Sequence, residues 1–484
     1  MAELKEVWPA RTILKYETDI VEEALRLIAI RSVKGPAEPG KPYGAGVDRA
    51  LQYMLSLGER LGFRSTNLDG YAGHIEFGEG DEYVGVLVHL DTVDAGDGWT
   101  VDPFGGVVRD GLLIGRGASD NKGPAVVALY ALAALRDAIL MPETKIRIIL
   151  GTDEESGMSD MDYYFAKEPP PKYAFAPDAA YPIIHAEKGY YVLTVRGRGD
   201  ERPSREAASW RLAGGDAANV VPDRCSLELR FDGGQFQRHA RERLLAAAAT
   251  HPHVAVERES SEGHVRLSMR GKLGHGSYPP SGINAVARML EFMADALPDT
   301  LASSPLLAFV HSRIGHEAFG ETLGLAAADP THGRLTVNLG VMKAGWDGEQ
   351  AEPAYAALNV RYPVTSDGAA VFDAFRSRCE SHGLQAAVER HMPPLYVPES
   401  HPLLVKLGGA YEAVMEEPAK LLSIGGGTYA RKLQGRGVAF GAGFPGRNHG
   451  PGAHQPDETA SIADLMLHGR ICTQALYELQ RRDG

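Results

Sequence analysis

A short run, YVGVLVHL from Tyr83 to Leu90, limits the possible folds of this chain most strongly. The run is almost continuously apolar and rich in β-branched residues. This composition over so few residues is typical of a strand buried on both faces of its sheet. Strand patterns of this kind alternate with helix patterns over the first 180 residues or so. The alternation predicts a layered α/β domain.

The other elements of this domain are indicated by the spacing of apolar residues. Residues 20–30 have the helical period, and Thr18 or Asp19 is suited to cap that helix. We expect further helices over 50–63 and 123–138, and further strands over 144–152 and 173–178.

The middle of the chain has a different pattern of predicted elements, with strand pairs separated by helices. The segment NVVPDRCSLELRF (219–231) is echoed by EPAYAALNVRYPV (352–364), and each ends near an Arg–aromatic pair. This echo predicts an α+β domain made of two similar halves. We therefore expect a catalytic domain over 1–188 and 395–484, interrupted by an inserted domain over 189–394, with the proline-rich stretch 391–402 as the return linker.

Length and composition narrow the class of protein. A chain of 484 residues is too long for one core, and a net charge of −13 disfavours nucleic acid as a partner. Cys225, Cys379 and Cys472 form no C-x-x-C pair, which argues against a disulfide scaffold and favours a reducing compartment. No apolar run has the length of a signal peptide or a membrane span. We expect a cytoplasmic protein that binds neither membrane nor nucleic acid.

Acidic residues and histidine follow the strands, where sites of open α/β sheets lie. His89 and Asp91 follow the first run, Asp153, Glu154 and Glu155 follow the next strand, and Asp178 follows the last; Asp120 precedes a helix. Any one of these residues alone is explained more simply as a polar residue at a solvated strand end. Together they predict a site for Zn²⁺, Co²⁺ or Mn²⁺, with room for two ions bridged by a carboxylate. Asp91 is suited to accept a ring N–H of His89.

Other catalytic patterns are absent from the sequence. There is no G-x-x-x-x-G-K-[ST], no H-E-x-x-H and no G-x-S-x-G. The glycine-rich stretch SIGGGTYARK lacks nucleotide-binding spacing, and it is either a tight turn or a backbone surface beside a ligand.

Seven segments together resemble the M20 family of metallopeptidases, and within it the PepV-type dipeptidases. They are HLDTVDAGDGWTVDPF, GRGASDNKGP, TDEESG, PDAAYP, GHGSYPPSGINA, GGGTYARK and AHQPDE. The resemblance extends from the first helix to the last. It implies a two-zinc peptidase domain with a mixed sheet flanked by helices, a large inserted lid domain, and hydrolysis of dipeptides. A deacylase acting on N-acyl amino acids is the alternative, and a catalytically silent binding protein would require the loss of a ligand.

The resemblance also implies the roles of individual residues. His89, Asp120 and Asp178 would hold one zinc, while Asp120, Glu155 and His454 would hold the other, with Asp120 as the bridge. Glu154 would be the general base on a metal-bridged water, and Asp91 would orient His89. His449 lies five residues before His454 and is an equally good type of ligand, but the family pattern H-Q-x-x-E selects His454.

The resemblance assigns substrate contacts to the lid and to the glycine-rich stretch. His275 would stabilise the oxyanion, Asn219 and Arg361 would bind the terminal carboxylate, and Gly426 and Thr428 would face the substrate. Asp153 is a candidate partner for the free amine. Similar enzymes have a cis peptide at the position of Asp120–Asn121, and a doubled lid of this length implies a monomer.

Overall fold

The computed structural model describes residues 8–139, 141–197, 203–260, 263–447 and 449–482. These residues pack into two compact units. Unit 1 comprises the described residues within Met1–Ala186, Leu395–Leu422 and Gly427–Gly484, and unit 2 those within Glu187–Pro394 and Ser423–Gly426. The sequence predicts that Ser423–Gly426 belongs to the last part of the catalytic domain, whereas its contacts join it to unit 2.

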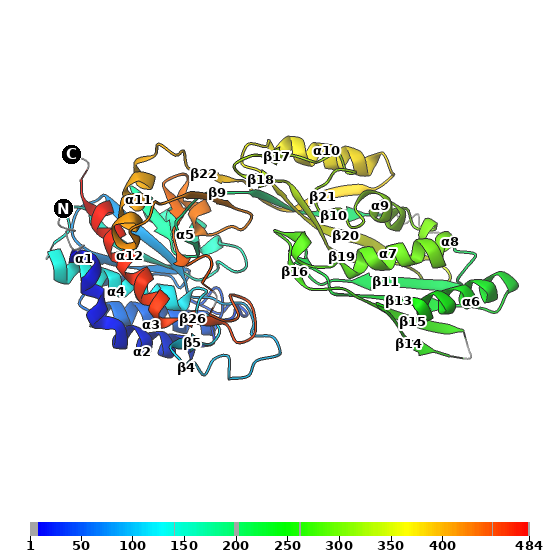
Figure 1. Ribbon diagram of the computed structural model, residues 1–484, viewed down its shortest axis with the longest axis horizontal. Coiled ribbons are helices and arrows are strands. Elements are labelled where there is room, and N and C mark those ends of the chain that lie inside the picture. Colours follow the sequence, from blue (N-terminus) through cyan, green and yellow to red (C-terminus); the bar gives the residue numbers. More distant parts are fainter. Residues whose placement is uncertain (1–7, 140, 198–202, 261–262, 448, 483–484) are drawn as a thin grey trace. The chain divides into compact units, whose positions relative to one another are not determined.

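A mixed sheet forms the centre of unit 1, as the sequence predicted (Figure 1). Its central strands β6, β3 and β7 run parallel, while β1 and β2 are antiparallel additions at one edge. Every residue of β3 is buried, which fits the apolar run that defines it. In sheet order the strands are β1 (Arg64–Leu68), β2 (Ala72–Phe77), β6 (Lys145–Gly151), β3 (Tyr83–His89), β7 (Tyr173–Ala176), β24 (Gly437–Ala439), β9 (Ile183–Glu187) and β22 (Leu395–Tyr396), with β23 (Leu421–Ile424) paired to β9.

Short strands complete unit 1 beside this sheet. Two of them pair in parallel next to the strand ends, β8 (Ala179–Ala180) with β25 (Ala442–Gly443). Three more form a small antiparallel sheet, β26 (Thr459–Ser461), β5 (Leu112–Ile114) and β4 (Val107–Arg109).

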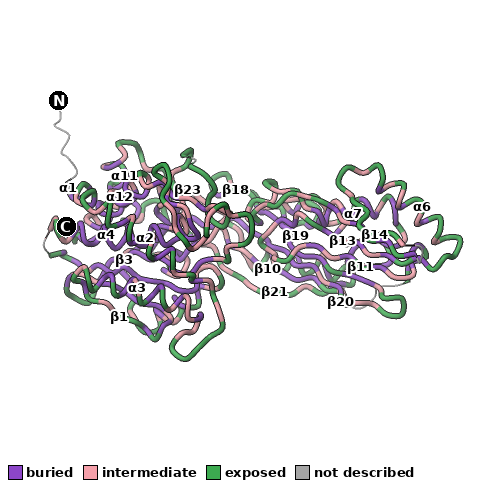
Figure 2. Tube along the Cα trace, turned by 90° about the horizontal axis from the view of Figure 1, so that it is seen from below, coloured by how far each residue is buried: buried purple, intermediate pink, exposed green. Residues whose placement is uncertain are grey.

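Helices cover the sheet of unit 1, and Figure 2 shows β3 and its neighbouring helices as a largely buried region. Helix α4 is buried along most of its length and packs against both β3 and α12. The helices are α1 (Trp8–Arg11), the 3-10 turn η1 (Thr12–Tyr16), α2 (Glu17–Ile28), α3 (Ala45–Arg60), α4 (Lys122–Ile139), α5 (Ser159–Lys167), α11 (Pro402–Met415), the 3-10 turn η3 (Tyr429–Leu433) and α12 (Ile462–Gln480).

The predicted cap of α2 was wrong. Thr18 and Asp19 lie inside the helix, which begins at Glu17 directly after η1, and its N-cap Tyr16 makes no side-chain capping bond. The 3-10 turn provides a carbonyl acceptor, that of Leu14, for the backbone N–H of Glu17 at the start of the helix. A capping side chain is therefore not needed there.

Unit 2 contains an antiparallel sheet whose order shows the expected doubling. The order is β14-β15-β13-β11-β19-β20-β10-β21, so each half contributes four strands and the halves meet at the β11–β19 pair. In each half a hairpin-like pair is followed by a helix and then by an edge strand. The strands are β10 (Gly189–Arg196), β11 (Ser209–Gly214), β13 (Arg224–Arg230), β14 (Val254–Glu259), β15 (His264–Arg270), β19 (Thr336–Trp346), β20 (Ala351–Tyr362) and β21 (Gln385–Met392).

The helices of unit 2 pack on this sheet and share one apolar core with it. They are α6 (Gln235–Thr250), the 3-10 turn η2 (Pro279–Ser281), α7 (Ala285–Ala296), α8 (Pro298–Ala302), α9 (Pro305–Arg313) and α10 (Gly368–Glu380). Two short pairs lie outside the main sheet, β12 (Val220–Val221) with β16 (Gly274–His275), and β17 (Ala328–Asp329) with β18 (Gly333–Arg334). Within the described ranges, no helix is both long enough and apolar enough to traverse a bilayer.

Candidate metal centre

The parallel strands of unit 1 bring the predicted acidic residues to one edge of the sheet. His89 is the last residue of β3, Glu154 and Glu155 follow β6, and Asp178 follows β7. Because β3 pairs in parallel with both β6 and β7, their carboxyl ends meet at this edge.

Two groups of ligand type form around Asp120. The Nε2 atom of His89 lies 2.9 Å from one Asp120 oxygen and 3.5 Å from an Asp178 oxygen. The other Asp120 oxygen lies 3.2 Å from Nε2 of His454, which is 3.1 Å from Glu155. Asp120 therefore stands between two His–carboxylate groups, where the sequence analysis expected a bridge.

The two histidines of the 449–454 loop have different partners. His454 reaches Asp120 and Glu155, whereas Nε2 of His449 lies 2.9 Å from Asp464 at the start of α12.

The peptide bond between Asp120 and Asn121 is cis, as the family resemblance implies.

The donor set fits divalent metal ions of the zinc type. Imidazole and carboxylate ligands without thiolates suit Zn²⁺, Co²⁺ and Mn²⁺. His89, Asp120 and Glu155 offer ligand atoms within 4.8 Å of one another, and so do His89, Glu154 and Asp178. One oxygen of Glu155, Oε1, is buried and has no hydrogen-bond partner within the described part of the chain. An orphaned carboxylate oxygen beside such a cluster is the position that a cation would satisfy.

The pKa values show how strongly these groups influence one another. Burial, together with the charge of Asp178, raises the pKa of Glu154 well above its ordinary value, and burial with the charge of Asp120 raises that of Glu155 to about 7. Hydrogen bonds to Asp120 and Glu155 raise the pKa of His454 to about 11. Burial and mutual charge thus disfavour the ionised form of both glutamates, and a bound cation would favour it.

Asp91 contacts the site in a way that the sequence did not reveal. Nδ1 of His89 lies 3.0 Å from the backbone carbonyl of Asp91 and 3.5 Å from its carboxylate. That carboxylate instead accepts the backbone N–H groups of Glu154 and Glu155, at 3.2 and 3.1 Å. Asp91 therefore holds both His89 and the turn that carries the two glutamates.

A second buried carboxylate, Asp160, holds the preceding part of the same turn. It accepts the N–H groups of Thr152 and Asp153, at 2.6 and 3.1 Å, and the hydroxyl of Tyr429. Burial raises the pKa of Asp160 to about 7. Four consecutive backbone amides, from 152 to 155, are thus bound by two carboxylates, which fixes the turn that carries Glu154 and Glu155.

The sequence suggests Asp153 as a partner for the substrate amine. In the structure, however, its side chain is not accessible to a substrate. Its carboxylate is buried and accepts hydrogen bonds from Lys34 at 2.6 Å, from Ser156 and from Ser159. Although burial opposes ionisation, these bonds hold its pKa below the ordinary value.

Glu458 is a site residue to which sequence reasoning gave no role. Its buried carboxylate pairs with the buried Arg116 at 2.7 Å and accepts the N–H groups of Gly117, Ser119 and Asp120 at 2.9–3.2 Å. Glu458 follows His454 by four residues, so it joins the loop of one ligand to the loop of the bridging ligand. The final acid of the pattern H-Q-x-x-E was the available signal.

In unit 2, the predicted oxyanion and carboxylate contacts lie on neighbouring segments. Val220 pairs with His275, and the N–H of Gly276 donates to the carbonyl of Asn219 at 2.7 Å. The exposed His275 ring is held through Nδ1 by the Ser277 hydroxyl at 2.6 Å. Asn219 and His275 are therefore adjacent.

Arg361 is connected to the same region. Its guanidinium donates to Asn359 at 2.8 Å and to the carbonyl of Gly425, and lies over the Tyr190 ring at 4.9 Å. A Cβ atom placed on Gly425 would lie 3.3 Å from Cβ of Ser277, so Gly425 packs directly on the His275 loop.

The two glycine-stretch residues lie in different units. Gly426 belongs to unit 2, whereas Thr428 is in unit 1. The buried Thr428 side chain caps η3 by accepting the N–H of Ala430 at 3.2 Å. Thr428 therefore has a structural role in addition to the substrate role that the resemblance implies.

A mixed α/β sheet that gathers two histidines and four carboxylates at one edge is typical of metal-dependent hydrolases. The model of peptidase family M20/M25/M40 matches residues 85–478. The chain belongs to this family, which confirms the predicted membership.

Curated relatives match the chain over nearly its full length. A Bacillus subtilis protein named "Putative dipeptidase YtjP" is 37% identical over 481 residues, covering 98% of this chain and 100% of the relative. A Staphylococcus aureus protein named "Putative dipeptidase SAR1836" is 33% identical over 485 residues, with coverage of 96% and 98%.

Solved structures share the fold at low identity. Human carnosine dipeptidase 1 has a TM-score of 0.58 and 16% identity, with 99% of each chain covered. The dipeptidase Dug1p of Saccharomyces cerevisiae has a TM-score of 0.55 and 12% identity, with coverage of 99% of this chain and 98% of Dug1p. These matches confirm the predicted fold class.

Removing the Glu458 carboxylate is expected to destabilise the protein and weaken metal binding. Glu458→Ala leaves the buried Arg116 uncompensated, which typically costs about 3–5 kcal/mol. It also frees the Asp120 loop, and the loss of such a supporting contact lowers metal affinity by about 10–100-fold. Denaturant unfolding and metal titration measure the two effects. The matched control is Glu79→Ala, which breaks an exposed pair with Arg64 and should change stability by less than about 1 kcal/mol.

The two histidines of one loop allow a direct test of metal ligation. His454→Ala is expected to lower the metal content of the purified protein from two ions per chain towards one. His449→Ala removes only the contact with Asp464 and should leave the content at two. Elemental analysis of both variants after dialysis measures this, and equal losses would contradict the assignment.

Proposed function

We propose that this protein is a dipeptidase that uses two metal ions held by His89, Asp120, Glu155, Asp178 and His454. The observation that carries the proposal is the position of Asp120 between two His–carboxylate groups, with Glu154 beside them. The dipeptidase names of the relatives and the family membership support it.

The metal assignment rests on the donor set described above. His89, Asp120 and Asp178 would hold one ion, and Asp120, Glu155 and His454 the other. We propose Zn²⁺, with Co²⁺ or Mn²⁺ as substitutes. When bound, the pair would lower the pKa of a water molecule towards neutrality and polarise the substrate carbonyl.

Glu154 is the proposed general base and, later, the general acid. Its backbone is fixed by Asp91, and its side chain lies within reach of His89 and Asp178. In this position Glu154 takes a proton from the attacking water and delivers it to the leaving amine. Asp91 acts through the residues that it positions.

The substrate contacts in unit 2 complete the proposal. The inserted domain, proposed as 189–394, would serve as a lid, and in the sequence it separates the catalytic parts 1–188 and 395–484. His275 would donate to the oxyanion, Asn219 and Arg361 would bind the free carboxylate, and Gly426 and Thr428 would provide a backbone surface. The planar guanidinium of Arg361, already oriented by Asn359 and Tyr190, is suited to a carboxylate.

Cytoplasmic location is part of the proposal, supported by three cysteines that are buried and unpaired. We also propose that the protein acts as a monomer, since the two halves of the unit 2 sheet already pair with each other through β11 and β19. Light scattering should give a mass of 52.1 kDa, the mass of one chain, and twice that mass would contradict the proposal.

A panel of small substrates on two variants tests the function. The parent enzyme should cleave dipeptides with free termini and act poorly on C-amidated forms. Glu154→Gln should lose activity by about 10²–10⁴-fold with its metal retained, because a general base typically contributes this much. Glu155→Gln, the adjacent control, should lose both metal and activity.

The same panel separates the alternatives. If N-acyl amino acids were cleaved as fast as dipeptides, a deacylase of this family would be the better assignment. If Glu154→Gln lost its metal as well as its activity, Glu154 would be a ligand and not the base.

A further inference from the structure

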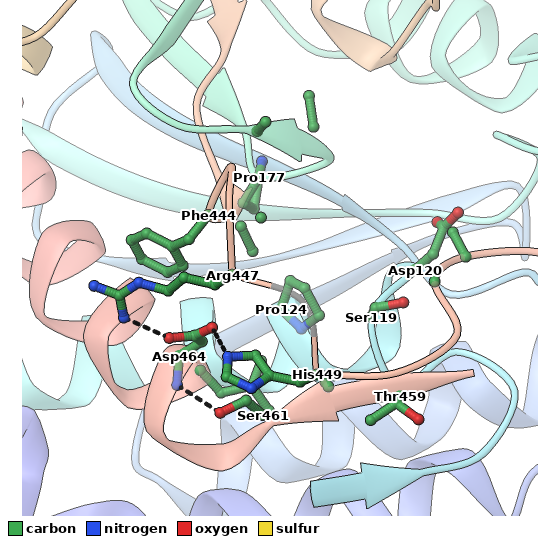
Figure 3. A pocket seen from close by; sticks show the side chains of 18 of the residues that line it. Ser119, Asp120, Pro124, Pro177, Phe444, Arg447, His449, Thr459, Ser461 and Asp464 are labelled. Carbon is green, nitrogen blue, oxygen red and sulfur yellow. Dashed lines mark hydrogen bonds and ion pairs between the residues drawn. The ribbon is translucent and has the colours of Figure 1, made fainter. Parts of the chain in front are cut away.

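A pocket in unit 1 opens beside the metal ligands, and apart from those ligands its wall has no role in the proposed reaction. Its volume is about 490 Å³, within the range of ligand pockets, and Asp120 and Asp178 form part of its wall. Figure 3 shows Asp120 and Ser119 at one side of the pocket, and Arg447, His449 and Asp464 at the other.

Most of the remaining wall is apolar. Pro124 at the start of α4, Leu465 in α12 and Phe444 contribute bulk, while Ala180 and Ala442 of the β8–β25 pair are small. The small residues leave the space between the bulky ones open. Such a wall favours an apolar group as the occupant.

On the side of the pocket away from the metal ligands, the charged side chains are paired with one another. Asp464 binds Arg447 at 2.7 Å through one carboxylate oxygen and His449 at 2.9 Å through the other, and the Arg447 guanidinium lies over Phe444 at 5.1 Å. A charged occupant would have to compete with these pairs, so the pocket is better suited to a neutral side chain.

We infer that this pocket receives the side chain of the substrate's amino-terminal residue, and that it prefers a large apolar or aromatic one. The inference rests on the proposed dipeptidase function. The carbonyl that the two ions would polarise belongs to the amino-terminal residue of a dipeptide. The side chain of that residue is therefore the one that lies beside Asp120 and Asp178 and enters the pocket.

Two substitutions that fill the pocket test this. Gly452→Leu adds a side chain to a wall residue whose Cβ would meet no heavy atom within 4 Å, and Ala180→Phe adds a ring from the opposite strand pair. The matched control is Gly409→Leu in α11, where an added Cβ also meets nothing within 4 Å and which is not part of the pocket wall.

The readout is a ratio of kcat/KM values for Phe-Gly, Gly-Phe and Gly-Gly. Both filling variants should lower the Phe-Gly to Gly-Gly ratio by about 10–100-fold, since excluding a well-packed apolar group has effects of this size. The Gly-Phe to Gly-Gly ratio should change by less than about twofold, and Gly409→Leu should leave both ratios at the parent values. In the parent, Phe-Gly should be preferred over Glu-Gly and Lys-Gly.

Calorimetry in the Glu154→Gln background measures binding without turnover. Adding Gly452→Leu there should weaken Phe-Gly binding by about tenfold or more and leave Gly-Phe binding within about twofold. Equal changes for both dipeptides, or no change for either, would overturn the inference while the parent still cleaves dipeptides. A selective loss for Gly-Phe would overturn the assignment to the amino-terminal residue. A parent that cleaves no dipeptide would overturn the proposed function, and this inference with it.

Discussion

Four carboxylates held close together at the edge of one sheet are the constraint on which the rest of unit 1 depends. Asp120, Glu154, Glu155 and Asp178 repel one another, and two histidines alone are a weak counterbalance. Burial, and after it the charge of the neighbouring carboxylates, raises the pKa values of Glu154 and Glu155. This arrangement of carboxylates is favourable only when cations bind between them. Cation binding therefore explains why so many acidic side chains converge where the parallel strands end.

The protein holds these ligands by using other buried carboxylates as acceptors for backbone amides. Asp160 binds the amides of residues 152 and 153, Asp91 those of 154 and 155, and Glu458 those of 117, 119 and 120. The directions of Asp120, Glu154 and Glu155 are thus set through their main chain, which leaves their side chains free to bind. Arg116 supplies the compensating charge for Glu458.

The sequence was most informative where side chains follow strands. His89, Glu155 and Asp178 could be placed together because the pattern revealed parallel strands, whose ends must meet. His454 could not, since it lies about 300 residues further on in a loop without periodicity, and only the family resemblance distinguished it from His449. The backbone amides that Asp91 and Glu458 bind could not be predicted, because such partners leave no trace in residue identities. The start of α2 was misjudged for a related reason, since the 3-10 turn before it has no distinctive composition.

The segment Ser423–Gly426 has a practical consequence for dissecting the molecule. These four residues pack with unit 2 although the chain on either side of them belongs to unit 1, and the Gly425 carbonyl is an acceptor for Arg361. The polypeptide therefore passes between the units four times and not twice. A recombinant fragment cut at 187 and 394 would keep the Asn359 acceptor of Arg361 but lose the Gly425 acceptor. A fragment that preserves unit 2 would need the missing tetrapeptide, added as a separate strand or through a designed linker.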